Sequence, residues 1–233
     1  MKGIYILADY PDKKTFEKEL NYAMNSNIDF IEIGIPFNDP VADGPTIAKA
    51  ANEIAERGYD LLSIIDLIGE LKKKKVYLMT YSNIIYKFGV KKFSDIAKGI
   101  VDGLILADLP NRGHNFFYKL GLEVDIINFL TPESRDNAIK KLVNAEGDFI
   151  YFIGVRGITG GEVDFNNSEL RSKYISIKKE IDKKVILGFG VKTKADTKTI
   201  MEYADGFVIG TEIVKRQNNY KEFKKYIDEI FTT

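Results

Sequence analysis

The stretch FIEIGIPFNDPVADG (residues 30–44) joins a short apolar run to a turn-rich loop that carries acidic side chains. Alternation with period two over residues 30–35 predicts a β-strand and puts Glu32 on the same face as Phe30 and Gly34. We therefore expect Glu32 to point into the core. A buried ionised carboxylate costs several kcal/mol unless it is paired or solvated. Glu32 thus predicts either a structural ion pair or a catalytic acid and base with a shifted pKa.

The loop after this strand favours the catalytic interpretation. Asp43 lies eleven residues beyond Glu32 and adds a second carboxylate. Pro36, Pro40 and Pro45 restrict the backbone, so the loop follows a constrained path between the two acids.

The composition excludes several classes of function. Basic and acidic residues balance at 34 each, so we expect no general attraction to nucleic acid or to an anionic membrane. The chain has no cysteine and a single histidine, His114, which excludes thiolate metal sites and histidine clusters and argues against a Ser-His-Asp hydrolase. The apolar run before Asp9 is too short for a secretory signal or a membrane span. We expect a cytoplasmic protein with no metal site and no nucleic-acid or membrane partner.

Short β-branched runs alternate with longer amphipathic, lysine-rich segments, which is typical of repeated strand–helix units. We predict eight strands, at residues 3–8, 29–35, 76–80, 103–107, 123–128, 149–154, 185–188 and 206–209. We predict helices at residues 13–25, 46–57, 61–73, 91–98, 113–119, 135–145, 168–180, 194–202 and 220–230. This series favours an α/β fold with one domain over residues 1–233, a closed (β/α)8 TIM barrel, and leaves an open doubly wound sheet as the alternative. No helix is expected before the first strand.

A barrel predicts that the chemistry gathers at the carboxyl ends of the strands, where the βα loops meet. Polar loops follow strands two, three, four and six, at residues 34–45, 81–83, 108–110 and 156–161. Glycine-containing turns follow the last three strands, as ITGG (158–161), GFG (188–190) and IGT (209–211). In a barrel such turns can cradle a phosphate through backbone N–H groups, with Thr159 or Thr211 adding a hydroxyl. Ordinary turns between elements are the alternative.

Together these motifs resemble the tryptophan synthase α subunit family. The resemblance is carried, in order, by IEIGIPFNDPVADGPTI (31–47), MTYSN (79–83), LILADLP (104–110), GITG (157–160), GFG (188–190) and VIGTEIV (208–214). The segment PFNDPVADGP is the most specific of them, whereas GFG and IGT occur in many phosphate-binding barrels. The resemblance implies a lyase reaction, the retro-aldol cleavage of indole-3-glycerol phosphate to indole and glyceraldehyde 3-phosphate, with no cofactor in this chain.

The resemblance also implies roles for the two carboxylates. Glu32 falls on the family's catalytic glutamate, and Asp43 falls on its catalytic aspartate. Breaking the bond between indole C3 and the glycerol chain requires a proton delivered to C3, a proton removed from a hydroxyl, and stabilisation of positive charge on the ring nitrogen. A glutamate with a raised pKa can move both protons, and an ionised aspartate can hold the ring N–H.

Further family positions carry over one by one. The expected substrate-binding residues are Tyr5, Met79, Tyr81, Ala107, Phe129, Tyr151, Thr159 and Phe189. The expected phosphate-binding residues are Gly160, Gly190, Gly210 and Thr211. Apolar and aromatic side chains suit a flat indole ring, although Tyr151 could equally be an aromatic core residue. One departure from the family is the start of the first strand near Met1, where relatives usually carry a helix that closes the bottom of the barrel.

The family binds a β subunit that carries pyridoxal phosphate, in an α2β2 assembly, and passes indole to it. The contact would involve residues 36–42 and residues 156–167, and the second of these loops is glycine-rich and polar, as a mobile lid would be. An ordinary surface loop is the alternative. Three other functions stay open: a stand-alone lyase that releases free indole, a weakly active subunit that mainly activates the β subunit, and a phosphosugar isomerase or epimerase, which would not need residues 36–45.

Overall fold

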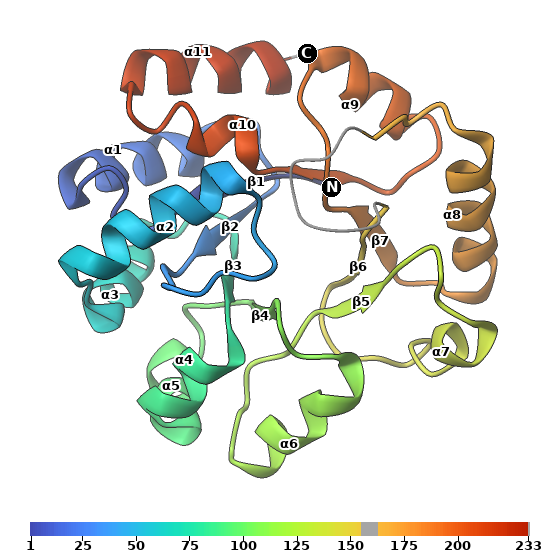
Figure 1. The fold of residues 1–233 in the computed structure, drawn as a ribbon, viewed down its shortest axis with the longest axis horizontal. Helices are drawn as coiled ribbons and strands as arrows, with labels where there is room; N and C mark the ends of the chain where they lie inside the picture. The colour runs from blue at the N-terminus through green and yellow to red at the C-terminus, as the bar shows by residue number, and fades with distance from the viewer. Residues whose placement is uncertain (155–162, 233) are drawn as a thin grey trace.

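Eight parallel strands form one sheet with helices arranged around it (Figure 1), in a computed structural model that describes residues 1–154 and 163–232. The strands are β1 (Lys2–Leu7), β2 (Phe30–Gly34), β3 (Lys75–Thr80), β4 (Gly103–Leu106), β5 (Asn128–Leu130), β6 (Phe149–Phe152), β7 (Lys184–Leu187) and β8 (Phe207–Ile209). The helices are α1 (Lys13–Met24), α2 (Pro45–Arg57), α3 (Leu61–Leu71), α4 (Ser82–Phe88), α5 (Val90–Ala97), α6 (His114–Lys119), α7 (Asp136–Lys140), α8 (Ser168–Glu180), α9 (Lys194–Met201), α10 (Thr211–Val214) and α11 (Tyr220–Phe231), with a 3-10 turn η1 (Asn111–Gly113) before α6.

Hydrogen bonds between β4 and the segment that leads into β5 close the barrel. The sheet order is β4-β3-β2-β1-β8-β7-β6-β5, so β4 and β5 are its two ends. The Leu104 N–H donates to the Asp125 carbonyl at 2.7 Å, and the Ile127 N–H donates to the Leu104 carbonyl at 2.8 Å. The predicted TIM barrel is therefore confirmed, and the open sheet is excluded.

Two predicted elements differ from the structure, and two short helices were not predicted. The fifth strand was expected at residues 123–128, but the ladder with β6 is formed by Asn128–Leu130, and the earlier residues meet β4 only through an isolated bridge at Ile126. The helices not predicted from the sequence are α4, directly after β3, and α10, directly after β8. The helix expected at residues 135–145 ends at Lys140 and continues as turns.

Local sequence signals set where several helices begin and end. Asp12 caps α1 by accepting from the Thr15 N–H at 3.0 Å. Thr193 and Asp196 form a reciprocal capping box at the start of α9, which satisfies N–H groups that have no partner within the helix. Gly58 follows α2 with a φ of 79°, a left-handed conformation that glycine adopts without a steric cost.

Aromatic rings fill the barrel interior at the end where the strands begin. Phe30, Tyr77 and Phe149 are each fully buried, and their ring centroids lie 5.0 to 5.6 Å apart. The Tyr77 hydroxyl donates to the Asp148 carboxylate at 2.6 Å. These rings therefore fill the barrel interior near the amino ends of β2, β3 and β6.

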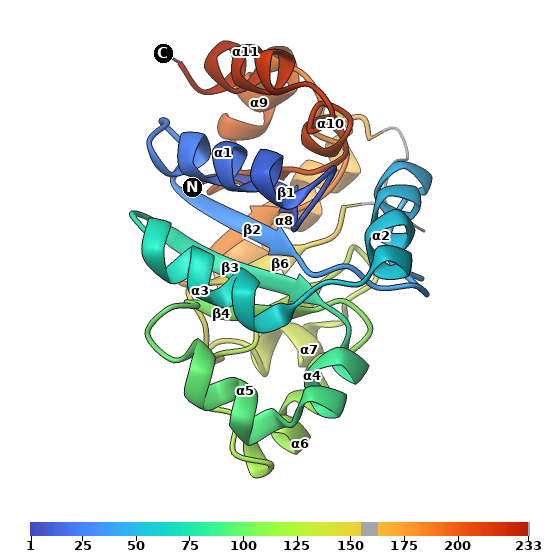
Figure 2. The ribbon, with the colours of Figure 1, turned by 90° about the vertical axis from the view of Figure 1, so that its left-hand side faces the viewer.

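The strand direction determines which end of the barrel can carry a site. The β2 and β3 arrows in Figure 2 point toward the side on which α2 lies. The loop 35–44 thus emerges at the carboxyl ends of the strands and leads into α2. Among the described residues, no helix is long and apolar enough to cross a membrane.

Candidate active site

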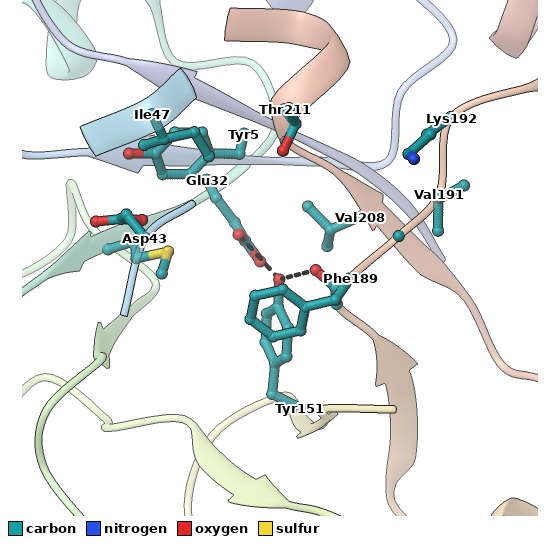
Figure 3. Close-up of a pocket in the computed structure, with 14 residues that line it drawn as sticks. Tyr5, Glu32, Asp43, Ile47, Tyr151, Phe189, Val191, Lys192, Val208 and Thr211 are labelled. Carbon is teal, nitrogen blue, oxygen red and sulfur yellow. Dashed lines mark hydrogen bonds between the residues drawn. The ribbon is translucent and has the colours of Figure 1, made fainter. Parts of the chain in front are cut away.

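A pocket opens at the carboxyl ends of the strands (Figure 3). Its described lining consists of Tyr5, Glu32, Asp43, Ile47, Met79, Tyr151, Gly188, Phe189, Gly190, Val191, Lys192, Val208, Gly210 and Thr211. These residues come from six of the eight strands or the segments that follow them, and from the start of α2. Segments far apart in the sequence therefore meet at one end of the barrel, as the fold prediction requires.

Glu32 lies in the barrel interior near the pocket floor. Its side chain is 1 % exposed, and the β2 register pairs it with Tyr5 on one side and Tyr77 on the other. Burial raises the pKa of Glu32 to about 8, against a smaller lowering by the hydroxyl of Tyr151, which donates to Oε2 at 3.3 Å. Glu32 Oε1 is buried and has no hydrogen-bond partner among the described residues. At neutral pH, Glu32 is therefore a neutral acid with one oxygen left available.

Asp43 lies on the opposite side of the pocket from Lys192 in Figure 3, on the loop between β2 and α2. Burial raises its pKa to about 6, and a hydrogen bond of 2.9 Å from the Tyr81 hydroxyl to Oδ2 lowers it by a smaller amount. Tyr81 also accepts from the Ala42 N–H at 3.0 Å, so it fixes the loop as well as the carboxylate. Near pH 7, Asp43 is ionised while Glu32 remains protonated.

Glycine residues keep the other side of the pocket open. A Cβ at Gly188 would overlap the Tyr151 ring, and one at Gly190 would overlap Val163. Gly190 also has a φ of 85°, which favours glycine. Gly210 differs, because a Cβ there would lie 3.7 Å from Ile47 and Tyr5, an ordinary contact distance. The fold does not need glycine at position 210, but the missing side chain leaves room for a ligand.

The structure places the residues expected at the site in three groups. Those that line the pocket are Tyr5, Glu32, Asp43, Met79, Tyr151, Phe189, Gly190, Gly210 and Thr211. Tyr81, Ala107 and Phe129 lie outside the lining: Tyr81 bonds Asp43, Phe129 packs on the Tyr151 ring at 5.8 Å, and Ala107 continues β4 through a hydrogen bond to Thr80. Thr159 and Gly160 lie outside the described residues, as does most of the loop expected to act as a lid.

Several lining residues were not predicted from the sequence, and Lys192 is the charged one among them. Ile47, Val191 and Val208 are apolar, and each directly follows or belongs to a quoted motif. Lys192 lies two residues after the GFG turn, in the stretch KTKAD that looks like the exposed start of a helix. The sequence signal that could have identified Lys192 is its position two residues after GFG, a glycine turn of the kind that binds phosphate.

The arrangement can perform acid-base chemistry on a flat, phosphorylated molecule. A protonated acid and an ionised carboxylate share a pocket with the rings of Tyr5, Tyr151 and Phe189. Backbone N–H groups beside the glycines, together with the Thr211 hydroxyl, can donate hydrogen bonds to an anion. Two carboxylates whose pKa values are set by different surroundings can take different roles.

Comparisons with known proteins agree with this geometry. The family described as "Tryptophan synthase alpha chain" matches residues 4–231. The tryptophan synthase alpha chain of Staphylococcus carnosus is 36% identical over 233 residues, which span 93% of this chain and 90% of the relative. The alpha chain of Lachnospira eligens is 34% identical, over 94% of this chain and 86% of the relative. The structure of tryptophan synthase subunit alpha from Campylobacter jejuni superposes with a TM-score of 0.87 at 31% identity, over 98% of this chain and 94% of that one.

Proposed function

Because the chain belongs to the tryptophan synthase alpha chain family, we propose specific roles for its residues in the reaction of that family. The function is the lyase step of tryptophan biosynthesis, the cleavage of indole-3-glycerol phosphate. The observation that carries the residue roles is the pairing of a protonated Glu32 with an ionised Asp43 in one pocket beside glycine turns.

We propose that Glu32 moves both protons of the reaction. Its carboxyl group donates a proton to indole C3, which places positive charge on the ring nitrogen. The carboxylate then removes the proton of the hydroxyl on the adjacent glycerol carbon. The electron pair of that O–H bond forms the aldehyde, the carbon–carbon bond breaks, and its electron pair returns to the ring. Glu32 ends protonated again, so the cycle needs no other acid.

The surroundings of Glu32 support this role. A carboxyl group with an ordinary pKa would be ionised at neutral pH and could not donate, whereas burial keeps Glu32 protonated. Tyr151 donates to Oε2, which leaves the unpartnered Oε1 to carry the proton toward the substrate. Tyr151 is therefore a positioning residue for Glu32.

We assign electrostatic stabilisation to Asp43. An ionised carboxylate that accepts the indole N–H becomes more favourable as positive charge builds on the ring nitrogen, so it stabilises the transition state more than the ground state. The hydrogen bond from Tyr81 holds the carboxylate and favours its ionised form.

The phosphate group is assigned to the glycine side of the pocket. Backbone N–H groups near Gly190, Gly210 and Thr211 can approach an anion because little side-chain bulk lies in the way. We include Gly160 and Thr159 in this assignment on the family resemblance alone.

The family pairs with a β subunit, and we propose the same α2β2 assembly here, with indole passed to that subunit and pyridoxal phosphate bound there rather than in this chain. The loop 36–42 carries Val41, an apolar side chain that is 63% exposed. In the same loop, the Phe37 ring lies 4.8 Å from the Tyr81 ring, which itself bonds Asp43. A partner that presses on this loop would therefore act on the geometry of Asp43. We expect this biosynthetic enzyme in the cytoplasm.

The test is indole release from indole-3-glycerol phosphate by the purified chain, with and without a β subunit. Glu32→Gln and Asp43→Asn keep the shape of each side chain and remove its acid-base or charge function. We expect each to lower kcat/KM by a factor of roughly 100 or more, within the usual range for positioned acid-base groups. A rate like that of the wild type in either variant would refute the role assigned to that residue. Full activity without a β subunit would favour the stand-alone lyase.

A further inference from the structure

Lys192 is the one positively charged side chain among the described residues that line the pocket. Figure 3 shows its ammonium group on the same side of the pocket as Thr211, across from Asp43. Gly190 and Gly210, which also line the pocket, are the glycines assigned above to the phosphate group. The charge therefore lies with the anion-binding part of the pocket and away from the catalytic aspartate.

The backbone of Lys192 is held from two sides. Its N–H donates to the Asp196 carboxylate at 2.9 Å, and its carbonyl accepts from the Tyr226 hydroxyl at 2.6 Å. Asp196 belongs to the capping box of α9, and Tyr226 lies on α11. Because this backbone is fixed and the side chain is half-buried, Lys192 has less conformational freedom to lose when it binds a ligand.

The ammonium group of Lys192 has no ion-pair partner among residues 1–154 and 163–232. The two cations directly after α10 differ. Lys215 and Arg216 both pair with the Glu212 carboxylate, each at 2.7 Å. Within the described lining of the pocket, Lys192 therefore carries a positive charge that remains available to a ligand.

We infer that the Lys192 ammonium binds the phosphate group of the substrate and makes the pocket selective for phosphorylated over unphosphorylated indole glycerol. This inference rests on the proposed function. Backbone N–H groups orient a phosphate but bring no net charge, while Glu32 and Asp43 contribute only negative charge when they ionise. A lysine supplies the missing positive charge through a charge-assisted hydrogen bond, which is stronger than a neutral one.

The selectivity can be measured as the ratio of kcat/KM for indole-3-glycerol phosphate to kcat/KM for the same molecule without its phosphate. Lys192→Gln removes the charge and keeps a polar side chain. We expect the ratio to fall roughly 10- to 100-fold, as for the loss of a hydrogen bond between charged groups. Lys192→Arg should restore much of the ratio, since it keeps the charge. Lys194→Gln is the matched control, because it removes an exposed charge two residues away whose ammonium group bonds the Thr232 carbonyl.

A binding measurement separates this inference from the proposed function. Calorimetric titration with glycerol 3-phosphate needs no turnover, and its dissociation constant should rise by a similar factor in Lys192→Gln but not in Lys194→Gln. Thermal unfolding of each variant checks that it is folded. If the chain binds glycerol 3-phosphate through Lys192 but cleaves no substrate, the phosphate-binding role of Lys192 stands and the proposed function fails. An unchanged ratio and dissociation constant in Lys192→Gln, an equal loss in Lys194→Gln, or no binding by the wild type would overturn the inference.

Discussion

Replacing Tyr81 by phenylalanine should move the acid limb of the pH profile and leave the alkaline limb in place. The Tyr81 hydroxyl donates to Asp43 Oδ2 at 2.9 Å and favours the ionised carboxylate. The proposed mechanism requires Asp43 to be ionised and Glu32 to be protonated, so kcat/KM should have a bell-shaped dependence on pH. Its limbs should lie near pH 6 for Asp43 and near pH 8 for Glu32.

The size of the shift follows from the energy of the lost hydrogen bond. A hydrogen bond to a charged group contributes about 1.5 to 3 kcal/mol, and one pKa unit corresponds to about 1.36 kcal/mol. Asp43 is only half-buried, so water replaces part of the lost interaction. We therefore take the lower end and expect the acid limb to rise from near 6 to about 7 in Tyr81→Phe.

The assay is kcat/KM for indole release between pH 5 and 9, because this parameter reports groups of the free enzyme. Tyr86→Phe is the matched control, since its side chain is 58% exposed and stacks on Phe116, outside the pocket. A lower rate at every pH with both limbs unmoved would mean that Tyr81 only supports the loop. An acid limb that moves to lower pH would refute the reasoning about charge.

Three further predictions concern the glycines, a second buried acid and the partner surface. Gly210→Ala should weaken glycerol 3-phosphate binding, measured by calorimetry, with little change in the free energy of unfolding, because its Cβ meets only ordinary contacts. Gly188→Ala should instead lower the free energy of unfolding by roughly 1 to 3 kcal/mol through overpacking, measured by urea unfolding. Glu19 is fully buried, and burial raises its pKa from 4.5 to about 8 despite the hydrogen bond from Gln217. The contribution of protonated Glu19 to the free energy of unfolding is complete below pH 4.5 and is lost as pH rises through 8. The loss is roughly 5 kcal/mol at about 1.36 kcal/mol per pKa unit. In urea unfolding, Glu19→Gln should therefore become more stable than the wild type as pH rises. Val41→Asp should weaken binding of a β subunit at least roughly tenfold, since it removes apolar contact area and adds a charge; titration with the β subunit measures the change.

Matched changes elsewhere on the surface serve as controls for these predictions. Glu17→Gln, on the exposed face of α1, makes the same chemical change outside the core and is the control for Glu19→Gln. Val143→Asp changes a side chain that is 43% exposed, away from the loop 36–42, and should leave the affinity for a β subunit unchanged. If Glu19→Gln follows the pH dependence of the wild type, Glu19 is not the buried acid that the structure indicates.

The pattern of the chain was enough to predict the barrel and most of its elements, because strand and helix periodicities are local. The inward direction of Glu32 followed from alternation alone, and the structure buries it as expected. The fifth strand was misplaced because residues 123–128 have a strand-like composition but little ladder to join. Whether such a run becomes a strand depends on the hydrogen bonds that neighbours offer, and those neighbours are distant in sequence.

The sequence by itself determined the family, the order of strands and helices, and the two carboxylates, because motifs and periodicity are written in neighbouring residues. Only the tertiary structure decided what surrounds each group. The pKa of Glu32 depends on burial in the barrel interior and on a hydrogen bond from Tyr151, which is 119 residues away. Tyr81 reaches Asp43 across 38 residues of sequence, and Lys192 joins the pocket because α9 and α11 hold its backbone. Desolvation and charge act through space, so the acidity of a side chain and the ligand it can bind are properties of the folded barrel.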